Sequence, residues 1–333
     1  MNLIEAGVPP LAFVQLIQSQ ALDPDAVARF RNLMARAGTN EAALVQRDVQ
    51  VPLRWFREVY PELDVDQATL LGRAFAEQAQ LTSFGPLSLP LVSAGSVAEI
   101  VELLTYLPLI STALSPQFHP SDHGLMVGLT GHAVDPDLDC LVVTYCGSVL
   151  LRLLDMLVED VSTVTLHLGW PAPASLAQDE DALARRLFFD APMSFLHVPA
   201  DTLDEVCRFS DPLAYRLAIV DLQRTLDQWS GNTSFSEKVR RLLEEDPGQR
   251  SSQWVADELS ISTSTLKRRL SEEGTTFREL CQSFLRERAM LRLLDQSMSI
   301  SEIATDLGYS DLTNFSHAFK RWTGRSPSEF RHA

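Results

Sequence analysis

The sequence predicts two domains: an N-terminal α/β (α+β) domain, followed by an all-α domain in which two helix-turn-helix units are joined by a long helix. Its 333 residues exceed a typical single domain, and 45% of them are hydrophobic, which is ample for two cores. Short strand-like runs occur between residues 124 and 198, whereas a helical pattern appears twice after residue 252.

The net charge of −16 is concentrated in the first part of the chain. Residues 233–333 contain 15 Lys and Arg and 15 Asp and Glu, whereas residues 1–232 contain 13 basic and 29 acidic side chains. A neutral domain can still bind a polyanion when its basic residues gather on one face. We place the domain boundary between residues 1–230 and 231–333, because the stretch WSGNTSFSEKV (229–239) has the composition of a linker and a helix cap.

The first eighty residues show helical patterns. Examples are residues 9–20 (PPLAFVQLIQSQ) and residues 65–81 (VDQATLLGRAFAEQAQL), with a break at Pro61 and Asp64. Apolar or alternating runs predict strands at residues 124–130, 140–145, 164–168 and 193–198.

The segments between these runs complete the N-terminal domain. Residues 131–140 (GHAVDPDLDC) are expected to connect a hairpin, because Asp-Pro-Asp is typical of turns. Residues 147–161, rich in Leu and Met, are expected to form a helix on the sheet, and QDEDALARRL (178–187) is expected to begin another helix with an acidic first turn.

An internal repeat organises the last eighty residues. Residues 254–274 (WVADELSISTSTLKRRLSEEG) align with residues 302–324 (EIATDLGYSDLTNFSHAFKRWTG) at an offset of 48, which becomes 49 after the turn. Each copy has a short helix, a tight turn and a second helix. This pattern predicts helix-turn-helix units at about residues 252–273 and 300–323.

The residue types suit such units. Ala256 and Ala304 are small where the two helices of a unit approach, and Gly308 allows a positive φ in the turn. Ser262 and Ser310 are predicted to cap the second helices. Residues four apart predict the buried face of each second helix: Leu266 and Leu270 in the first unit, Phe315 and Phe319 in the second.

One long helix is predicted between the two units, over TTFRELCQSFLRERAMLRLLDQS (275–297). A helix of about 18 residues is roughly 27 Å long, comparable to the ~34 Å rise of one DNA turn. Two units joined in this way could therefore meet successive major grooves.

Residues from about 235 to 331 resemble the DNA-binding domain of the AraC/XylS family of bacterial transcription regulators. The resemblance rests on VADELSISTSTLKRRLSEEG and on SISEIATDLGYSDLTNFSHAFKRWTGRSPSEFR. It implies seven helices, two helix-turn-helix units and a monomer that covers two adjacent major grooves. Ser260 stands where glycine is common in the first turn, and we expect no functional consequence from that change alone.

The N-terminal region is similar, in patches, to the sensing and dimerisation region of AraC relatives grouped with the ornithine-utilisation regulator and the arabinose-binding type. The matching segments are residues 87–111 and 187–226. They imply that residues 1–230 form an effector-binding and dimerisation domain, and they do not specify the effector.

Alignment with the family assigns the DNA-facing residues. Those expected to read bases are Ser264, Lys267 and Arg268 in the first unit and Thr313, Ser316 and His317 in the second. Those expected to contact phosphates are Thr265, Arg269, Asn314, Lys320 and Arg321. Arg268 is the strongest candidate for guanine, because a guanidinium can bond O6 and N7 together. His317 replaces an arginine often found at its position.

Other candidate sites have simpler interpretations. His119 and His123 have a metal-ligand spacing, but Pro116 and Pro120 argue against a helix there. Cys140 and Cys146 with His132 could be imagined as a nucleophile and base, yet expected strands would bury the thiols. The acidic run at residues 179–181 is expected to be a solvated helix start, and Trp170 a core or loop anchor. The cysteines form no CxxC pair, so neither a zinc site nor disulfides are expected.

We therefore predict a transcription regulator without catalytic residues, cofactor or metal ion. The expected partners are double-stranded promoter or operator DNA, a second copy of the chain, RNA polymerase and a small-molecule effector. The N-terminus lacks a basic leader followed by an apolar core, and no uninterrupted apolar run reaches the ~18 residues of a membrane span, so we expect a cytoplasmic protein without membrane contact. The alternative is an α/β enzyme or sensor with an appended DNA-targeting module.

Overall fold

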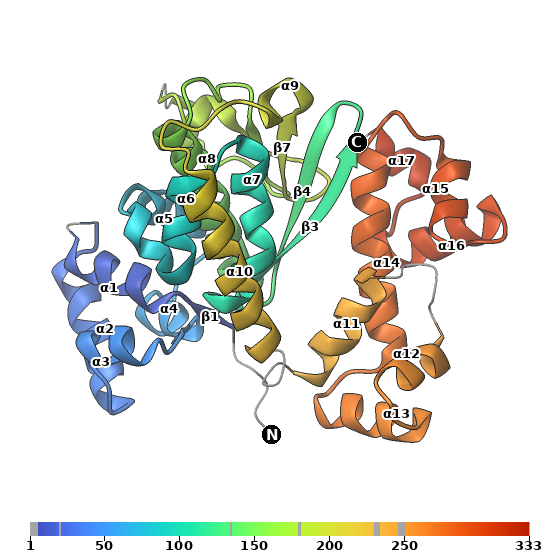
Figure 1. Cartoon of the computed structure of the whole chain (residues 1–333), viewed down its shortest axis with the longest axis horizontal. Helices are drawn as coiled ribbons and strands as arrows, with labels where there is room; N and C mark the ends of the chain where they lie inside the picture. The colour runs from blue at the N-terminus through green and yellow to red at the C-terminus, as the bar shows by residue number, and fades with distance from the viewer. Residues whose placement is uncertain are drawn as a thin grey trace. The chain divides into compact units, whose positions relative to one another are not determined.

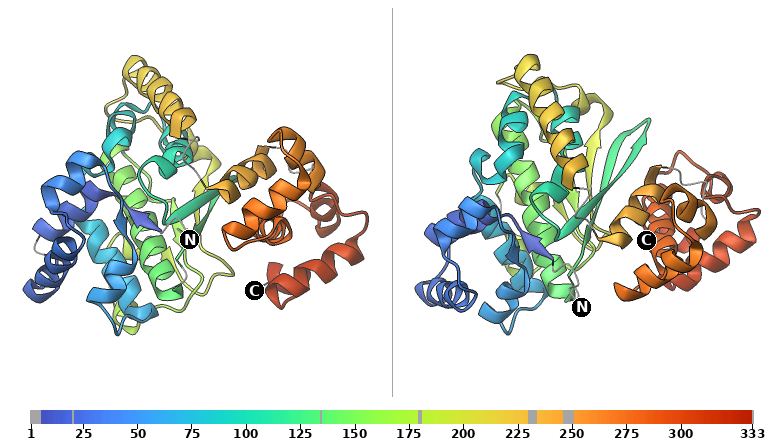
Figure 2. Two further views of the ribbon diagram at one scale, coloured as in Figure 1. Left: turned by 90° about the horizontal axis from the view of Figure 1, so that it is seen from below. Right: turned by 60° about the horizontal axis from the view of Figure 1, so that its bottom comes forward.

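The computed structural model describes residues 6–332 apart from residues 20, 134, 179–180, 230–233 and 246–250. The chain divides into two compact units, Glu5–Leu226 and Asp227–Ala333 (Figures 1 and 2). The first combines helices with a sheet, and the described part of the second contains helices alone, which confirms the predicted fold class. The predicted linker falls mainly on residues 230–233, which lie outside the described residues.

Short helices make up the first hundred residues of the N-terminal unit. They are α1 (Pro10–Gln18), α2 (Pro24–Arg36), α3 (Glu41–Arg47), α4 (Arg54–Val59), α5 (Val65–Glu77), α6 (Ser88–Ser93) and α7 (Val97–Glu102), with 3₁₀ turns at Leu81–Leu87 and Leu103–Leu109. A two-residue strand β1 (Gly7–Val8) pairs antiparallel with β2 (Val51–Pro52). The predicted helices at residues 9–20 and 65–81 are confirmed, and the Asp64 side chain caps α5 by accepting from the backbone N–H of Gln67 at 2.8 Å.

A five-stranded sheet follows, with the order β3-β4-β7-β5-β6. Its strands are β3 (Leu114–Ser121), β4 (Gly124–Gly131), β5 (Thr165–His167), β6 (Leu187–Phe188) and β7 (Phe195–Pro199). Only the β5–β6 pair is parallel. The strands predicted at residues 124–130, 164–168 and 193–198 are confirmed. The sequence analysis did not predict β3. Its Pro116 and Pro120, which argue against a helix, are accommodated because β3 lies at the edge of the sheet.

The central helix α8 (Pro136–Leu157) corrects two predictions. The predicted strand at residues 140–145 lies inside this helix, and the predicted hairpin connection at residues 131–140 leads into it. Asp135 is its N-cap and Pro136 its first residue, so Asp-Pro-Asp begins a helix here rather than a turn. Arg57 of α4 donates to both Asp135 and Asp137, and this hydrogen bonding lowers the pKa of Asp135.

Burial on several sides explains why the apolar residues of α8 do not repeat with the period of a helix. It packs against α5 on one side and against β4 and β5 on the other, so apolar side chains surround it. Its length and hydropathy would suffice to cross a membrane, yet 72% of its most apolar window is buried inside the protein. Burial therefore overrides the strand propensity of the run from Val142 to Tyr145.

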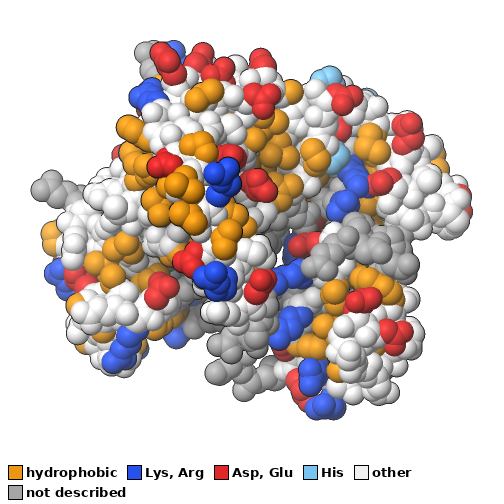
Figure 3. All heavy atoms as spheres, in the orientation of Figure 1, with side chains coloured by type: hydrophobic (Ala, Val, Ile, Leu, Met, Phe, Trp, Pro, Cys, Tyr) orange, Lys and Arg blue, Asp and Glu red, His pale blue; other side chains and the backbone are white. Residues whose placement is uncertain are grey.

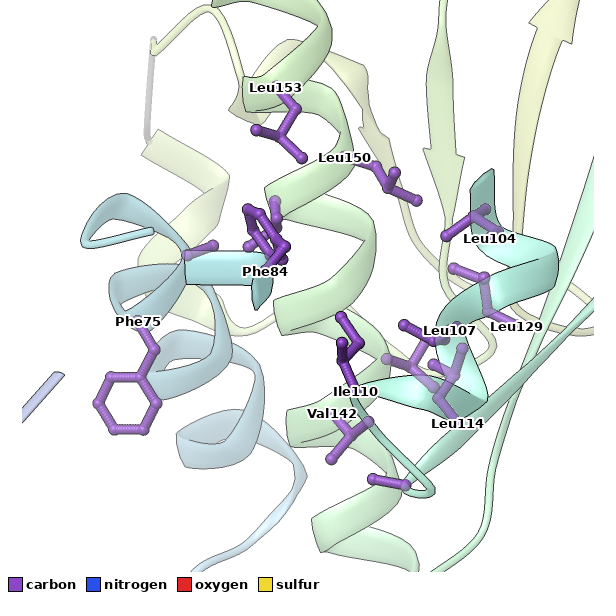
Figure 4. Packing of buried hydrophobic residues seen from close by; sticks show 14 of the residues in the cluster. Phe75, Phe84, Leu104, Leu107, Ile110, Leu114, Leu129, Val142, Leu150 and Leu153 are labelled. Carbon is purple, nitrogen blue, oxygen red and sulfur yellow. The ribbon is translucent and has the colours of Figure 1, made fainter. Parts of the chain in front are cut away.

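Figure 4 shows how the layers meet. Phe75 of α5 and Phe84 lie on one side of α8, whereas Leu107, Ile110 and Leu114 approach it from the other. The α5 and α8 backbones lie close together at Gly72, where an added Cβ would lie 2.6 Å from the Leu141 carbonyl oxygen. Only glycine allows this approach.

The remaining N-terminal segments are short except for one helix. They are the 3₁₀ turns Ala174–Gln178 and Ala184–Arg186, α9 (Ala200–Leu203) and α10 (Pro212–Trp229). The helix predicted to begin in QDEDALARRL is therefore wrong for the described residues of that stretch; Asp181 instead pairs with the buried Arg73 of α5 at 3.2 Å. Asp179 and Glu180 lie outside the described residues. Trp170 anchors its loop by donating from Nε1 to the Thr69 hydroxyl at 2.9 Å, as expected.

The C-terminal unit consists of seven helices over its described residues. They are α11 (Phe235–Glu245), α12 (Ser252–Glu258), α13 (Thr263–Glu272), α14 (Phe277–Leu294), α15 (Ile300–Asp306), α16 (Leu312–Thr323) and α17 (Pro327–Arg331). Their apolar faces share one core. The long linking helix is confirmed as the 18-residue α14.

Replacing Gly72 tests the contact between α5 and α8. Gly72→Ala should lower the free energy of unfolding by about 1–3 kcal/mol, because the new methyl group meets rigid backbone on α8. Chemical denaturation followed by circular dichroism measures the change. Gly169→Ala is the control, since its Cβ would have ordinary contacts at 3.5 Å or more. Equal stability of the two variants would contradict the close approach.

Candidate nucleic-acid interface

The first helix-turn-helix unit consists of α12 and α13. Ala256 is fully buried where the helices meet. The turn requires a left-handed residue, and Ser260 adopts φ 53° there. Ser262 caps α13 as predicted, since its hydroxyl accepts from the backbone N–H of Thr265 at 3.1 Å.

The second unit, α15 and α16, repeats this construction with one difference. Gly308 has φ 71° in the turn, as predicted. The predicted cap Ser310 is wrong: Asp311 caps α16 by accepting from the backbone N–H of Asn314 at 2.7 Å. The extra residue in this turn moves the cap one position along the chain. An aspartate suits this position, because the positive end of a helix favours a carboxylate.

Helix α14 holds the two units together. Thr276 and Glu279 form a capping box at its start. Along its length it packs against α11, α15, α16 and α17, and Figure 1 places α12 and α13 toward one end of it and α15 and α16 toward the other. Glu287 is buried on its inner side, where it accepts from Arg240 of α11 at 2.6 Å and from Ser283 at 2.8 Å.

The second helix of the first unit buries one face and exposes the other. Leu266 and Leu270 are buried in the core, as predicted. Ser264, Lys267 and Arg268 are exposed on the same helix, so the three predicted base-reading residues of this unit share its outer side.

Helix α16 has the same division. Phe315 and Phe319 are fully buried with ring centroids 5.8 Å apart. Thr313 and His317 are exposed and Ser316 is half-buried. The predicted phosphate contacts Asn314, Lys320 and Arg321 are also exposed on α16. These positions leave the predicted contacts available to DNA.

Four of the predicted DNA-contacting residues already have partners within the protein, one of them Asn314, whose side-chain amide donates to the Asp311 carboxylate at 2.6 Å. Arg268 donates to Glu272 at 2.6 Å, one turn along α13. Both side chains are more than half exposed, so this pair contributes little and can be exchanged for a base. The Arg269 guanidinium lies 5.3 Å from the ring centre of Phe235 in α11, which orients it toward α11. Thr265 is half-buried beside the Ser262 hydroxyl at 2.9 Å.

The C-terminal end of the chain supports the second unit. Gly324 ends α16 in a left-handed conformation, and Ser326 and Glu329 form a capping box for α17. Phe330 packs edge-on against Phe319, and Arg331 donates to the carbonyl oxygens of Leu293 and Met298. These contacts of the last residues therefore hold α17 against the C-terminal end of α14.

Sequence reasoning missed the corresponding support for α11. The Glu273 carboxylate accepts from the backbone N–H groups of Phe235 and Ser236, at 2.5 and 2.8 Å. It thus caps a helix 37 residues earlier in the chain. A spacing rule based on neighbouring residues cannot identify a cap from a distant segment.

The thiols in the N-terminal unit are poorly suited to catalysis. Cys140 and Cys146 lie on α8 rather than on a strand. Burial raises the pKa of each thiol to about 12, so both remain protonated near neutral pH. His132 instead lies beside the Ser115 hydroxyl at 2.6 Å. His119 and His123 fall on β3 and the following turn, and the described residues hold no cluster of metal-ligating side chains.

The N-terminal unit also contains an apolar cavity of about 80 Å³. Side chains from α1, α5, α8 and the two 3₁₀ turns between α5 and β3 line it, including Phe13, Phe75, Phe84 and Val149. The polar side chains in the lining are those of Gln78, Ser111, Tyr145 and Cys146, and the Ser111 hydroxyl donates to the Gly7 carbonyl oxygen at 2.8 Å. The cavity therefore offers mostly nonpolar contact.

Two family models match the chain. One, described as a helix-turn-helix domain, matches residues 255–333. The other, described as the N-terminal arabinose-binding domain of AraC transcription regulator, matches residues 28–206.

Several proteins are similar to parts of the chain. The ornithine utilization regulator of Pseudomonas aeruginosa is 28% identical over 176 residues, covering 53% of this chain and 52% of that protein. The regulator VqsM of the same species is 31% identical over 140 residues, covering 40% and 42%. The transcriptional activator AggR of Escherichia coli is 31% identical over 130 residues, covering 37% and 48%. The chain thus spans about half the length of the curated relatives it matches. The solved structure of CdpR from Pseudomonas aeruginosa aligns over 94% of this chain and 99% of that one, with 22% identity and a TM-score of 0.41.

Truncating Phe319 tests the orientation of α16. Phe319→Ala should destabilise the C-terminal unit by roughly 3–5 kcal/mol, because the ring is fully buried between Phe315 and Phe330. Thermal unfolding measures this loss. Leu312→Ala, at an exposed position of the same helix, should change stability little. Unaltered stability of Phe319→Ala would show that the assigned buried face is wrong.

Proposed function

The chain belongs to the AraC family of transcription regulators, and on that premise we propose that its C-terminal unit binds two successive major grooves of promoter DNA. One observation carries the proposal: two second helices, α13 and α16, each bury one face in a core to which α14 also contributes, and each exposes a polar face. At 18 residues α14 is about 27 Å long, close to the ~34 Å separation of major grooves on one side of a duplex.

The proposed contacts divide by chemistry. Ser264, Lys267 and Arg268 of α13 would read base edges, and the guanidinium of Arg268 can bond guanine at two atoms. Thr313, Ser316 and His317 would do the same from α16. The remaining candidates Thr265, Arg269, Asn314, Lys320 and Arg321 would contact phosphates. Phosphate contacts set the position of the protein without selecting sequence.

We further propose that the acidic N-terminal unit senses a small molecule and holds two chains together. An acidic domain repels phosphates, so it would affect DNA binding through association rather than direct contact. The matching arabinose-binding family model supports a ligand-binding role. The cavity favours an uncharged apolar effector, because a sugar or amino acid would leave polar groups unpaired against its lining.

We also propose that the protein regulates transcription in the cytoplasm by contacting RNA polymerase. AggR is an activator by name, which supports contact with RNA polymerase as one route of control. The protein would work in the cytoplasm. The competing hypothesis of an enzyme with a DNA-targeting tail is less well supported, since the named relatives are regulators and the N-terminal thiols of Cys140 and Cys146 have raised pKa values.

Selection of DNA sites by the full-length protein tests the readout. Arg268→Ala should weaken the best site by about 1–3 kcal/mol and relax preference at one or two base pairs. Two controls separate the causes. Glu272→Ala breaks the ion pair but keeps the guanidinium, so base preference should persist. Arg278→Ala removes an exposed arginine outside the recognition helices and should not alter base preference. Unchanged affinity and preference in Arg268→Ala would remove Arg268 from the reading face.

Thermal unfolding with small molecules tests the effector class. We expect uncharged apolar compounds of about benzene's size or smaller to stabilise the full-length protein, whereas arabinose and ornithine should not. Ala12→Leu should remove this response by filling the cavity, and Ala28→Leu, at an exposed position of α2, should retain it. Stabilisation by a sugar or an amino acid, without any response to apolar compounds, would contradict the assignment.

A further inference from the structure

The first helix of the C-terminal unit begins against α13. Helix α11 starts at Phe235, and the Glu273 carboxylate at the C-terminal end of α13 accepts from the backbone N–H groups of Phe235 and Ser236, one on each oxygen. A carboxylate is favoured at the positive end of a helix. These two hydrogen bonds therefore fix the start of α11, and with it the Phe235 side chain, beside α13. Figure 3 colours the side chains of this unit by type, with Lys and Arg in blue.

The Phe235 ring supports an arginine of α13. The Arg269 guanidinium carbon lies 5.3 Å from the centre of this ring, which is within the range of a cation–π contact. Arg269 is exposed, whereas the ring is half-buried against the core of the unit. Because the core holds the ring in place, the ring limits the positions that the long arginine side chain can adopt.

The start of α11 also keeps two opposite charges apart. Arg269 and Glu273 are one helical turn apart, a spacing at which arginine and glutamate attract each other. An ion pair between them would offset the charge that a phosphate contact uses. Instead, both Glu273 oxygens accept from the α11 backbone, and Arg269 lies over Phe235. A cation–π contact does not need the N–H donors of the guanidinium, so a phosphate can take them.

We propose that Phe235 is a positioning residue for DNA binding, which holds the Arg269 guanidinium ready for a phosphate, and that Glu273 keeps Phe235 in place. The inference rests on the proposed contact between Arg269 and the DNA backbone. It adds a residue from α11, which lies outside both helix-turn-helix units. The role concerns affinity rather than sequence selection, because a phosphate contact carries no base information.

Titration of a selected DNA site with the full-length protein at several salt concentrations tests Phe235. Phe235→Leu keeps an apolar side chain but removes the ring, so affinity should fall about three- to tenfold. Base preference should stay the same, and the salt dependence should lose about one phosphate contact. Phe235→Tyr keeps the ring face and should bind within about twofold of the wild type.

Phe277→Leu is the matched control. Phe277 is also a half-buried ring at the first position of a helix, α14. This variant should bind DNA within about twofold of the wild type, because it leaves the ring beside Arg269 unchanged.

A double-variant comparison separates positioning from general support of the fold. Phe235→Leu should have little further effect once Arg269→Ala is present, because the guanidinium that the ring supports is then absent. A merely structural role would give the same fold loss with and without Arg269. Circular dichroism at the temperature of the titrations should show folded protein in every variant.

Replacing Glu273 gives a test in which the two explanations predict opposite signs. Removing a negative charge near DNA ordinarily strengthens binding. We expect Glu273→Ala to weaken binding about threefold, because the start of α11 is released, and to add little to Arg269→Ala.

The outcomes distinguish the positioning role from the proposed function. Wild-type affinity in Arg269→Ala or Phe235→Leu, or an equal loss from Phe235→Leu with and without Arg269, would overturn the positioning role. Stronger binding by Glu273→Ala would overturn the part assigned to Glu273. A wild-type protein that selects no DNA site would instead refute the proposed function.

Discussion

The DNA-binding unit depends on the shared core that α14 provides. Neither helix-turn-helix unit has enough apolar surface to fold stably alone, because each consists of two short helices. Burying both in one core with the 18-residue α14 and with α11 solves this problem and also fixes their separation. The buried Arg240–Glu287 pair adds α11 to the same core, and Arg331 fastens α17 at the other end. Stability and spacing thus have a common origin, and damage to the core of one unit is expected to disturb the geometry of both.

The N-terminal unit is likewise built around one central helix. α8 lies between the sheet and α5, and its contact with Gly72 is too close to admit any other side chain without movement. The apolar cavity is lined by α8 and its neighbours. A ligand bound there would contact the same side chains whose packing positions the helices. α10 packs on this core through one face and exposes the other. The cavity, the core and α10 are therefore connected by packed side chains within one unit, and energetic coupling between sites can travel through such a network.

The sequence predicted the C-terminal unit better than the N-terminal one, for physical reasons. In the C-terminal unit the decisive signals are local: Ser262 caps the helix that follows it, Gly308 adopts a positive φ, and apolar residues four apart face the core. α8 is buried on opposite sides, so it lacks the polar face from which an amphipathic helix is recognised in a sequence. Its run of β-branched residues then resembles a strand. The Asp311 cap, the Glu273 cap on α11 and the position of the cavity depend on one added turn residue or on contacts between distant segments. The predicted DNA contacts lie on accessible helix faces, but accessibility is a property they share with many surface residues, and they stay predictions.

The length of α14 has an evolutionary consequence. In the proposed binding mode, substitutions on the outer faces of α13 and α16 would change the bases that each helix reads without affecting the core, so base preference would drift by single steps. Inserting one residue into α14 would instead turn the second unit by about 100° and shift it by ~1.5 Å, carrying its reading helix away from the groove. Descendants of this protein can thus acquire new recognition sequences far more easily than new distances between the two halves of a site.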